Sequence, residues 1–347
     1  MRAIAIVGRG CVLPGASSPE ALFQAVMDNR DCTSDVPEGR WRVHEDAVTG
    51  RGTDKTWSVR GGYVHDDITV AGLEGLDPLV HWAAHAAEQA MRGVAPVERG
   101  DVVLGNLSFP SSEHSAFAEA HWLGEHADAV GLADVDARNR FSSGMPAAHV
   151  AKHLGFDGER YCLDAACASS LYAIAHACDR LEDGLCDVAI AGAVNRADDL
   201  FIHIGFCALK AMSQTGRSRP FHADADGLVP AEGAAVVALK RLEDAERDGD
   251  RIYGVIRGVG LSNDGRAKNL LAPAVEGQVL AMERAYADAG WEPDTVELIE
   301  CHATGTTVGD ATEIESMRRV FPADHSLPTG SLKGNLGHLV TAAGAAG

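Results

Sequence analysis

One of the eight cysteines stands in a segment suited to nucleophilic chemistry. Cys167 lies within Tyr161–Leu171, which runs from an expected strand into an expected helix and surrounds the cysteine with alanine and serine. The unpaired N–H groups and the positive dipole end of a helix favour a thiolate at such a position. The small neighbours leave room for a substrate to reach the sulfur. Cys162, inside the strand, and Cys178, on the buried face of the helix, are explained by packing.

Two histidines in glycine-rich turns are candidate partners for this thiol. His302 follows an apolar strand and belongs to the turn Cys301–Asp310, and His338 closes the segment Lys333–His338. A cysteine nucleophile needs a base or a polarising group, and active sites of α/β sheets favour the carboxyl ends of strands. Bulky residues are absent around both histidines, so core packing is the weaker explanation for them.

Four motifs make the chain resemble the β-ketoacyl synthases, the condensing domains of fatty acid and polyketide synthases. They are Asp-Ala-Ala-Cys-Ala-Ser-Ser-Leu around Cys167, Arg-Ser-Arg-Pro-Phe-His-Ala-Asp-Ala-Asp-Gly at 217–227, His-Ala-Thr-Gly-Thr-x-x-Gly-Asp from His302, and Lys-Gly-Asn-Leu-Gly-His at 333–338. His222 departs from the family pattern, which has Asp at that place. The His-Ala-Thr-Gly-Thr variant and the acidic composition resemble most the iterative polyketide, enediyne or polyunsaturated fatty acid synthase branch.

The resemblance implies a decarboxylative Claisen condensation. Cys167 would carry an acyl group taken from the phosphopantetheine arm of an acyl carrier protein, and a malonyl-type thioester would then lose CO₂ to give an enolate. His302 and His338 would stabilise the oxyanion that develops. The resemblance implies no metal and no organic cofactor, because the carrier protein delivers the acyl groups.

Further residues of the same motifs would support this chemistry. Lys333 would orient one histidine or position the thioester carboxylate. Asp310 and Glu313 would hold nearby donors, although an acidic cap at a helix N-terminus explains both equally well. The remaining candidate substrate contacts are Thr304, Thr306 and Asn335.

Short runs rich in Val and Ile alternate with helical patterns, which is typical of layered α/β proteins. The expected strands are 4–7, 102–104, 188–193, 234–239, 252–259 and 296–300, and the clearest expected helices are 167–185 and 278–289. The resemblance implies the thiolase fold, in which two similar α/β halves pack in five αβαβα layers.

A single ketosynthase domain, 1–347, is expected to divide into two halves. The N-terminal half, 1–242, would carry insertions near 30–100 and 108–145, and the C-terminal half would be 252–347. The family pattern continues beyond Gly347 with further strands and a Gly-Phe turn that donates to the oxyanion. The chain is therefore expected to be a C-terminally truncated ketosynthase with an incomplete second half, and to condense poorly alone.

The charge balance limits the partners of this protein. With 30 Lys+Arg against 50 Asp+Glu, the net charge is −20, which argues against nucleic acid and anionic membrane as main partners. A local basic patch from Arg217, Arg219 and Lys268 is expected to dock the acidic carrier protein. The resemblance also implies a homodimer, with the strand 160–164 at the contact.

Length and cysteine usage point to an intracellular protein. No apolar run of about 18 residues is present to span a membrane. The apolar start of the chain is broken at once by Gly8-Arg9-Gly10, so it indicates a buried strand rather than an export signal. Eight cysteines without a Cys-x-x-Cys pair are expected to be reduced thiols in the cytoplasm.

Other interpretations of these residues remain open. A thiolase would use a second cysteine as base, whereas His338 stands here in a ketosynthase motif. A chain-length-factor-like or scaffold subunit would keep the fold without turnover, but such partners typically lose the nucleophile. Gly8-Arg9-Gly10 lacks the third glycine of a dinucleotide-binding turn. His81 and His85 have the spacing of zinc ligands but no intervening Glu, and packing histidines are the better explanation.

Overall fold

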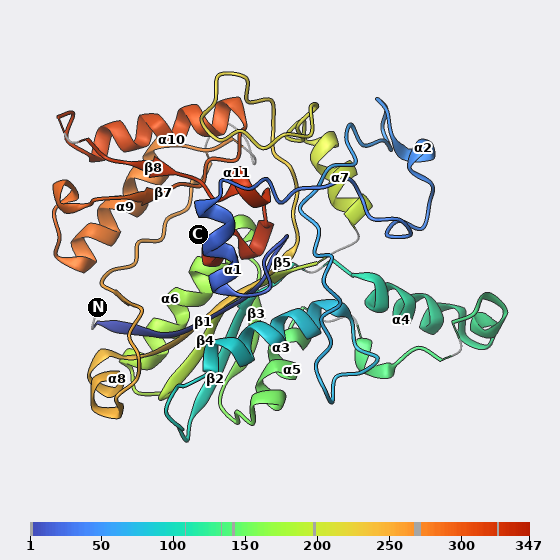
Figure 1. Ribbon diagram of the computed structural model, residues 1–347, viewed down its shortest axis with the longest axis horizontal. Coiled ribbons are helices and arrows are strands. Elements are labelled where there is room, and N and C mark those ends of the chain that lie inside the picture. Colours follow the sequence, from blue (N-terminus) through green and yellow to red (C-terminus); the bar gives the residue numbers. More distant parts are fainter. Residues whose placement is uncertain are drawn as a thin grey trace.

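The computed structural model describes residues 3–107, 109–132, 134–140, 143–196, 199–266, 272–324 and 326–347. Within these residues a six-stranded mixed sheet, in the order β3-β2-β4-β5-β1-β6, forms the centre of the molecule (Figure 1). The strands are β1 (Ile4–Val12), β2 (Gly100–Gly105), β3 (Arg160–Leu163), β4 (Val188–Asn195), β5 (Gly233–Arg241) and β6 (Gly254–Ile256). β2 is parallel to β3 and β4, whereas β5 is antiparallel to β4 and β1, and β6 to β1.

Helices cover both faces of this sheet. On one face lie α3 (Pro78–Met91) and α5 (Met145–Leu154), and on the other lies α6 (Ser169–Glu182). The alternation along β4 follows from this arrangement, because Ile190 packs in the cluster of α3 while Ala189 and Ala191 pack in the cluster of α6. β4 is buried along its whole length, as the run of apolar residues predicts.

Helix α3 corrects one expectation from the sequence. The range 30–100 was expected to be an insertion over the core, but α3 within it packs against β1 and β5 and contributes nine buried residues. Two glycines of β1 allow this contact, since a Cβ on Gly8 would lie 1.6 Å from the carbonyl oxygen of Ala90, and one on Gly10 would lie 1.8 Å from that of Ala86. The Gly-Arg-Gly sequence therefore serves helix packing. His81 is buried in the same helix, and its Nδ1 accepts the backbone N–H of Val70.

A second, smaller unit of structure follows β6. It contains α9 (Val275–Ala289), α10 (Thr307–Val320) and a two-stranded parallel sheet of β7 (Ile299–Glu300) and β8 (Thr329–Gly330). The expected strand 296–300 is thus reduced to two residues. The hydroxyl of Ser316 in α10 donates to Oε1 of Gln278 in α9 at 2.7 Å, which ties the two helices together.

The last segment of the chain returns to the large sheet. It comprises α11 (Lys333–Leu336), the 3₁₀ turn η5 (Val340–Ala342) and α12 (Ala343–Ala346). Leu336, Leu339 and Ala342 pack in one buried cluster with Cys11 of β1 and Ala193 of β4. This segment, red in Figure 1, therefore lies between the two-stranded sheet and the six-stranded sheet. It carries one of the two candidate histidines toward α6.

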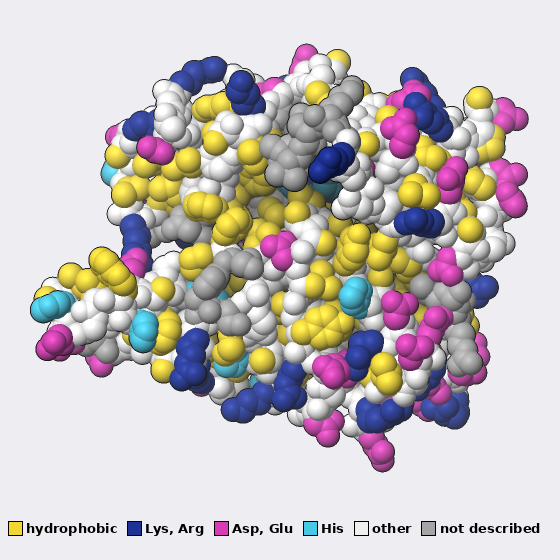
Figure 2. All heavy atoms as spheres, turned by 180° about the vertical axis from the view of Figure 1, so that it is seen from behind, with side chains coloured by type: hydrophobic (Ala, Val, Ile, Leu, Met, Phe, Trp, Pro, Cys, Tyr) yellow, Lys and Arg dark blue, Asp and Glu magenta, His cyan; other side chains and the backbone are white. Residues whose placement is uncertain are grey.

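The remaining described elements lie mainly around this framework. They are α1 (Pro19–Met27), α2 (Glu45–Val48), α4 (Ser112–Leu123), η1 (Gly124–Val130), η2 (Ala137–Asn139), η3 (Ala166–Ala168), α7 (Asp199–Ala208), α8 (Leu242–Asp248) and η4 (Pro293–Thr295). Figure 2 shows a face on which hydrophobic side chains gather around a hollowed centre and charged side chains lie mostly toward the rim. Among the helices that the structure describes, none combines the length and apolarity needed to cross a membrane.

Candidate active site

A strained turn presents Cys167. The turn η3 joins β3 to α6, and Ala166 adopts a positive φ of 50°, a conformation uncommon for a residue with a Cβ. Oδ1 of Asp164 accepts the N–H of Ala166 at 2.9 Å. Oγ of Ser169 accepts the N–H of Ala165 at 2.9 Å and donates to the carbonyl of Ala166 at 2.7 Å. The polar residues on both sides of the cysteine therefore fix its turn.

His338 reaches the sulfur from the end of α11. Gly337, with a φ of 82°, ends that helix, and the N–H of His338 donates to the carbonyl of Val229 at 2.7 Å. The carbonyl of His338 accepts the N–H of Ala231 at 2.9 Å. These bonds hold the imidazole with its Nε2 3.0 Å from Sγ of Cys167.

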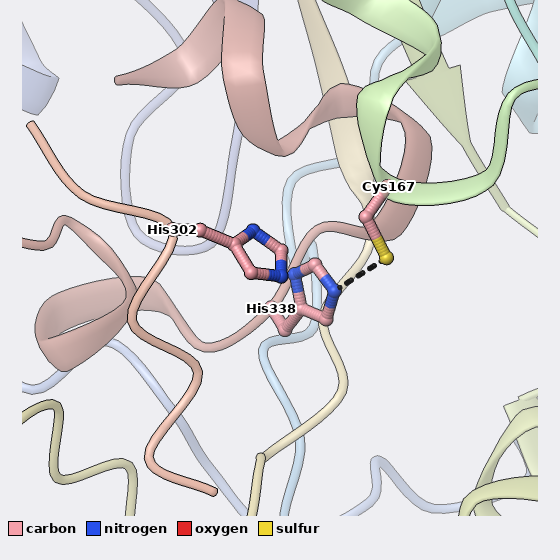
Figure 3. A group of neighbouring side chains, drawn as sticks. All are labelled: Cys167, His302 and His338. Carbon is pink, nitrogen blue, oxygen red and sulfur yellow. Dashed lines mark hydrogen bonds between the residues drawn. The ribbon is translucent and has the colours of Figure 1, made fainter. Parts of the chain in front are cut away.

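His302 approaches from the turn after β7. Its backbone N–H and that of Ala303 each donate to a carboxylate oxygen of Glu313 at 2.7 Å. The ring lies edge-to-face with that of His338, with 5.4 Å between centroids and an angle of 85° between planes. Figure 3 shows the His302 ring reaching toward His338, whose far nitrogen lies beside the sulfur of Cys167.

Asp310 links the first histidine turn to the segment 217–227. Its Oδ1 accepts the N–H of Gly305 at 3.1 Å and its Oδ2 accepts the N–H of Phe221 at 2.7 Å. The N–H of Gly227 in turn donates to the carbonyl of Gly305 at 2.9 Å. The four motifs singled out in the sequence thus meet around one place, although about 170 residues separate Cys167 from His338.

The thiol of Cys167 differs from the expectation that a helix start favours a thiolate. Burial raises the pKa of Cys167 from 9.0 to about 11, and the positive charge of Lys333 lowers it only in part. Loss of solvation therefore outweighs the favourable charges, because the charged form of the thiol would be taken out of water. At neutral pH the resting group is a thiol whose proton can pass to the imidazole beside it.

Both histidines are held neutral at physiological pH. The residue His302 is exposed, but loss of solvation by the surrounding protein lowers its pKa to about 4, with Lys333 acting in the same direction. Burial likewise lowers the pKa of His338 well below 6.5, followed by the charges of His302 and Lys333. Burial also lowers the pKa of Lys333, while the carboxylate of Glu300 opposes that change. Neutral imidazoles can accept a proton at one nitrogen and donate a hydrogen bond at the other.

A cavity of about 680 Å³ opens onto these three side chains. Its wall includes Thr304 and Thr306, whose hydroxyls lie 3.0 Å apart. Asn335 lies elsewhere, since its Nδ2 donates to the carbonyl of Arg30 at 3.0 Å and its side chain is not part of this cavity. Of the predicted residues, the cavity is lined by Cys167, His302, His338, Thr304, Thr306 and Glu313, whereas Lys333, Asp310 and Asn335 are not part of its wall.

The sequence reasoning missed part of the cavity wall. Phe206 of α7, Leu209 directly after that helix, and Gln278 of α9 also line it. No motif marks these residues. Phe206 and Leu209 resemble ordinary apolar residues of a helical segment, and Gln278 resembles an ordinary polar one. Ser169 carried a stronger signal, since it stands two residues after the cysteine within the recognised motif.

The fold and the site together define an α/β protein with a cysteine and two neutral histidines at one cavity. Residues 1–245 match the family described as β-ketoacyl synthase, N-terminal domain, and residues 253–347 match its C-terminal domain. The chain belongs to the β-ketoacyl synthase family.

Relatives of this family cover nearly the whole chain. A mycocerosic acid synthase-like polyketide synthase of Mycolicibacterium smegmatis is 37% identical over 99% of this chain and 17% of its own length. The pikromycin polyketide synthase component PikAIII of Streptomyces venezuelae is 33% identical over 99% of this chain and 23% of its own length. The chain thus spans less than a quarter of these two relatives.

Solved structures show the same fold. The PfaC keto synthase-chain length factor superposes with a TM-score of 0.91 and 39% identity, covering all of this chain and 41% of that one. The ketosynthase domain OzmH KS7 of Streptomyces albus superposes with a TM-score of 0.86 and 28% identity, covering all of this chain and 61% of that one. The α/β, thiolase-like fold expected from the sequence is therefore confirmed.

Proposed function

We propose that the chain is a β-ketoacyl synthase that joins an acyl group on Cys167 to a malonyl-type thioester by decarboxylative Claisen condensation. The observation that carries the proposal is the 3.0 Å contact between Sγ of Cys167 and Nε2 of His338, with His302 beside them at one cavity. Family membership supports the reaction type. The acyl groups would arrive on the phosphopantetheine of an acyl carrier protein.

The first step loads the enzyme. The thiol proton passes to Nε2 of His338 as Sγ attacks the carbonyl carbon of the acyl thioester. The C–S bond to phosphopantetheine breaks, and the leaving thiolate takes the proton back from the imidazolium. This relay suits the raised pKa of Cys167, because a standing thiolate is not required. A thioester on the enzyme replaces a thioester on the carrier.

The second step forms the new carbon–carbon bond. The malonyl carboxylate leaves as CO₂, and its electron pair becomes an enolate whose oxygen is stabilised by an N–H of His302 and by His338 in the tautomer that carries its proton on Nε2. The enolate carbon attacks the acyl carbonyl, the C–S bond to Cys167 breaks, and the departing thiolate takes one proton from solvent. Neutral imidazoles suit this role, since they donate hydrogen bonds without surrendering a proton to the enolate.

The supporting residues either position His302 or contact the substrate. Glu313 and Asp310 are positioning residues for the turn of His302, through the backbone hydrogen bonds described above. Lys333 would attract the malonyl carboxylate toward the cavity. Thr304 and Thr306 would contact the substrate at the cavity wall. The role predicted for Asn335 stays a prediction.

Two surfaces of the chain fit the expected partners. The edge strand β3 has no neighbour on its outer side among the described residues, so two copies could pair there as a homodimer. Arg217 is exposed, and the backbone of Arg219 lies beside Gly305 of the histidine turn. The positive charges of Arg217 and Arg219 are suited to guide an acidic carrier protein to the cavity. The third residue expected in this patch, Lys268, lies outside the described residues. Free cysteines throughout suit a cytoplasmic setting.

A condensation assay with the two histidine variants tests the proposal. His302→Ala and His338→Ala should each lower product formation from acyl- and malonyl-carrier proteins by about 10²–10³-fold. His338→Ala should also slow acylation of Cys167, because that imidazole receives the thiol proton. Wild-type turnover that is equally fast with a non-decarboxylating acetyl donor would favour a thiolase. Absence of a cerulenin adduct on Cys167 would favour a scaffold subunit.

A further inference from the structure

The thiol and the two imidazoles form a cluster with the donor set of a transition-metal site. One ligand atom each from Cys167, His302 and His338 lies within 4.8 Å of the others. A tetrahedral zinc ion, with bonds of about 2.0–2.3 Å, keeps its ligand atoms roughly 3.3–3.6 Å apart. The 3.0 Å between Sγ of Cys167 and Nε2 of His338 is slightly shorter than that separation. The 4.8 Å within which all three ligand atoms lie is slightly longer. Small side-chain rotations would therefore bring the three atoms to the spacing that zinc requires.

We infer that Cys167, His302 and His338 bind one Zn²⁺ ion, and that this ion holds the protein in an inactive state. In the binding step the S–H bond of Cys167 breaks, an S–Zn bond forms, and the proton passes to solvent. Zinc exchanges bound water for the sulfur and the two ring nitrogens and keeps a water at its fourth position. No electron is transferred, and the step needs no co-reactant.

Access and donor chemistry both support this site. The three residues line the open cavity of about 680 Å³, so a hydrated ion can reach them. Figure 3 shows the ring of His338 between that of His302 and the sulfur of Cys167, with the three side chains on three different segments of the chain. Thiolate and imidazole are the ligands that zinc prefers, and three protein ligands with one open position are typical of exchangeable zinc sites.

Occupancy of this site would block the proposed reaction. Zinc takes the sulfur lone pair that must attack the thioester and the ring nitrogens that must face the oxyanion. Metal binding itself needs no acyl substrate, so a failure of the proposed condensation would leave the metal site untouched. The ammonium group of Lys333 repels the Zn²⁺ ion, because its positive charge acts on all three ligand residues. This repulsion favours a reversible site over a permanent one.

Equilibrium dialysis with Zn²⁺ alone, followed by Co²⁺ absorption spectroscopy, tests the inference on the full chain. One metal equivalent and a sulfur-to-cobalt charge-transfer band are expected. Cys167→Ser, His302→Ala and His338→Ala should each weaken binding at least about tenfold. The half-buried Cys32 serves as the matched control, so Cys32→Ser should bind as the wild type does. Lys333→Met should lower the Kd several-fold.

A protection experiment on the unmodified protein avoids reliance on folded variants. Zn²⁺ should slow alkylation of Cys167 by iodoacetamide, and EDTA should restore the original rate, both measured on the Cys167 peptide by mass spectrometry. Alkylation that is equally fast with and without Zn²⁺ would overturn the inference. Metal binding that survives in all three ligand variants, or that is lost in Cys32→Ser, would also overturn it.

Discussion

The two parts of the molecule that build the active site are stabilised in different ways. The six-stranded sheet carries Cys167 at the end of β3, and its central strand β4 is wholly buried. The part that carries His302 rests on a two-stranded sheet whose residues are exposed or half-buried. Large apolar side chains are also exposed there, with Leu298 at 68% and Val308 at 65%. Apolar packing therefore supports the strands from which the Cys167 turn begins, whereas the part that carries His302 has little such packing and polar contacts position that histidine.

The turn of His302 is joined to the rest of the molecule by hydrogen bonds. Asp310 accepts backbone N–H groups from both sides of this joint, and Gly227 bonds to Gly305. Each buried hydrogen bond contributes about 1 kcal/mol, but leaving one of its groups unsatisfied costs more. Few contacts thus decide whether His302 faces the sulfur. This difference between the two parts leads to four predictions, ordered from the largest expected effect to the smallest.

A pair of cysteine variants compares the thiol of Cys167, beside the large sheet, with the thiol of Cys301, in the part that carries His302. Cys167→Ala should reduce condensation by at least about 10³-fold, because the acyl group loses its point of attachment. Cys301→Ala, in the strand-turn that leads to His302, should retain activity, since its buried thiol only packs. The turnover of both purified variants measures this. Residual condensation by Cys167→Ala at the wild-type rate would exclude Cys167 as the nucleophile.

A pair of glycine variants tests the difference in packing. Gly8→Ala should destabilise the protein by about 2–3 kcal/mol, because its Cβ would overlap the carbonyl of Ala90 in α3. Gly330→Ala in β8 should change the free energy of unfolding by less than about 0.5 kcal/mol, since nothing lies within 4 Å of its Cβ. Urea denaturation of both variants measures the free energies. Equal values would contradict the stated difference between the two sheets.

Asp310→Asn tests the joint itself. Replacing one carboxylate oxygen by an NH₂ group leaves either Gly305 or Phe221 without its acceptor, at a cost of about 1–3 kcal/mol. Hydrogen exchange should increase in 299–320 and stay unchanged in β4, because the loss affects the polar joint alone. Asp294→Asn, an exposed change in the same part, is the matched control. Increased exchange spread evenly over both parts would disprove a local joint.

Acid should weaken the sheet through one carboxylate, that of Asp187, which pairs with two arginines. The hydrogen bonds from Arg99 lower the pKa of Asp187 below 3.8, burial opposes this, and Arg241 lowers it further. A lowered folded pKa stabilises the protein above the unfolded value, and this contribution is lost as pH falls through the folded value. Asp187→Asn should therefore lower stability at neutral pH and show a smaller further loss as the pH falls below 3.8. Urea midpoints across this range measure the effect, and identical pH curves would refute it.

Much of the site could be predicted from the sequence because the decisive residues belong to local motifs. The turn around Cys167 needs Asp164 and Ser169, and both stand within a few residues of it. The role of α3 could not be predicted, since only the sheet reveals why Gly8 and Gly10 must lack a side chain. The pKa of Cys167 was also missed. A helix start is visible in a sequence, whereas the burial that raises the pKa arises from segments far along the chain.

The most direct test of the central claim is intact-protein and peptide mass spectrometry after mixing the chain with an acyl-carrier protein. We predict one acyl group per chain, located on the peptide that contains Cys167. Addition of malonyl-carrier protein should then remove that group from the chain and release CO₂. Acylation at any other cysteine, or an acyl group on Cys167 that persists while the malonyl thioester is decarboxylated, would contradict the account.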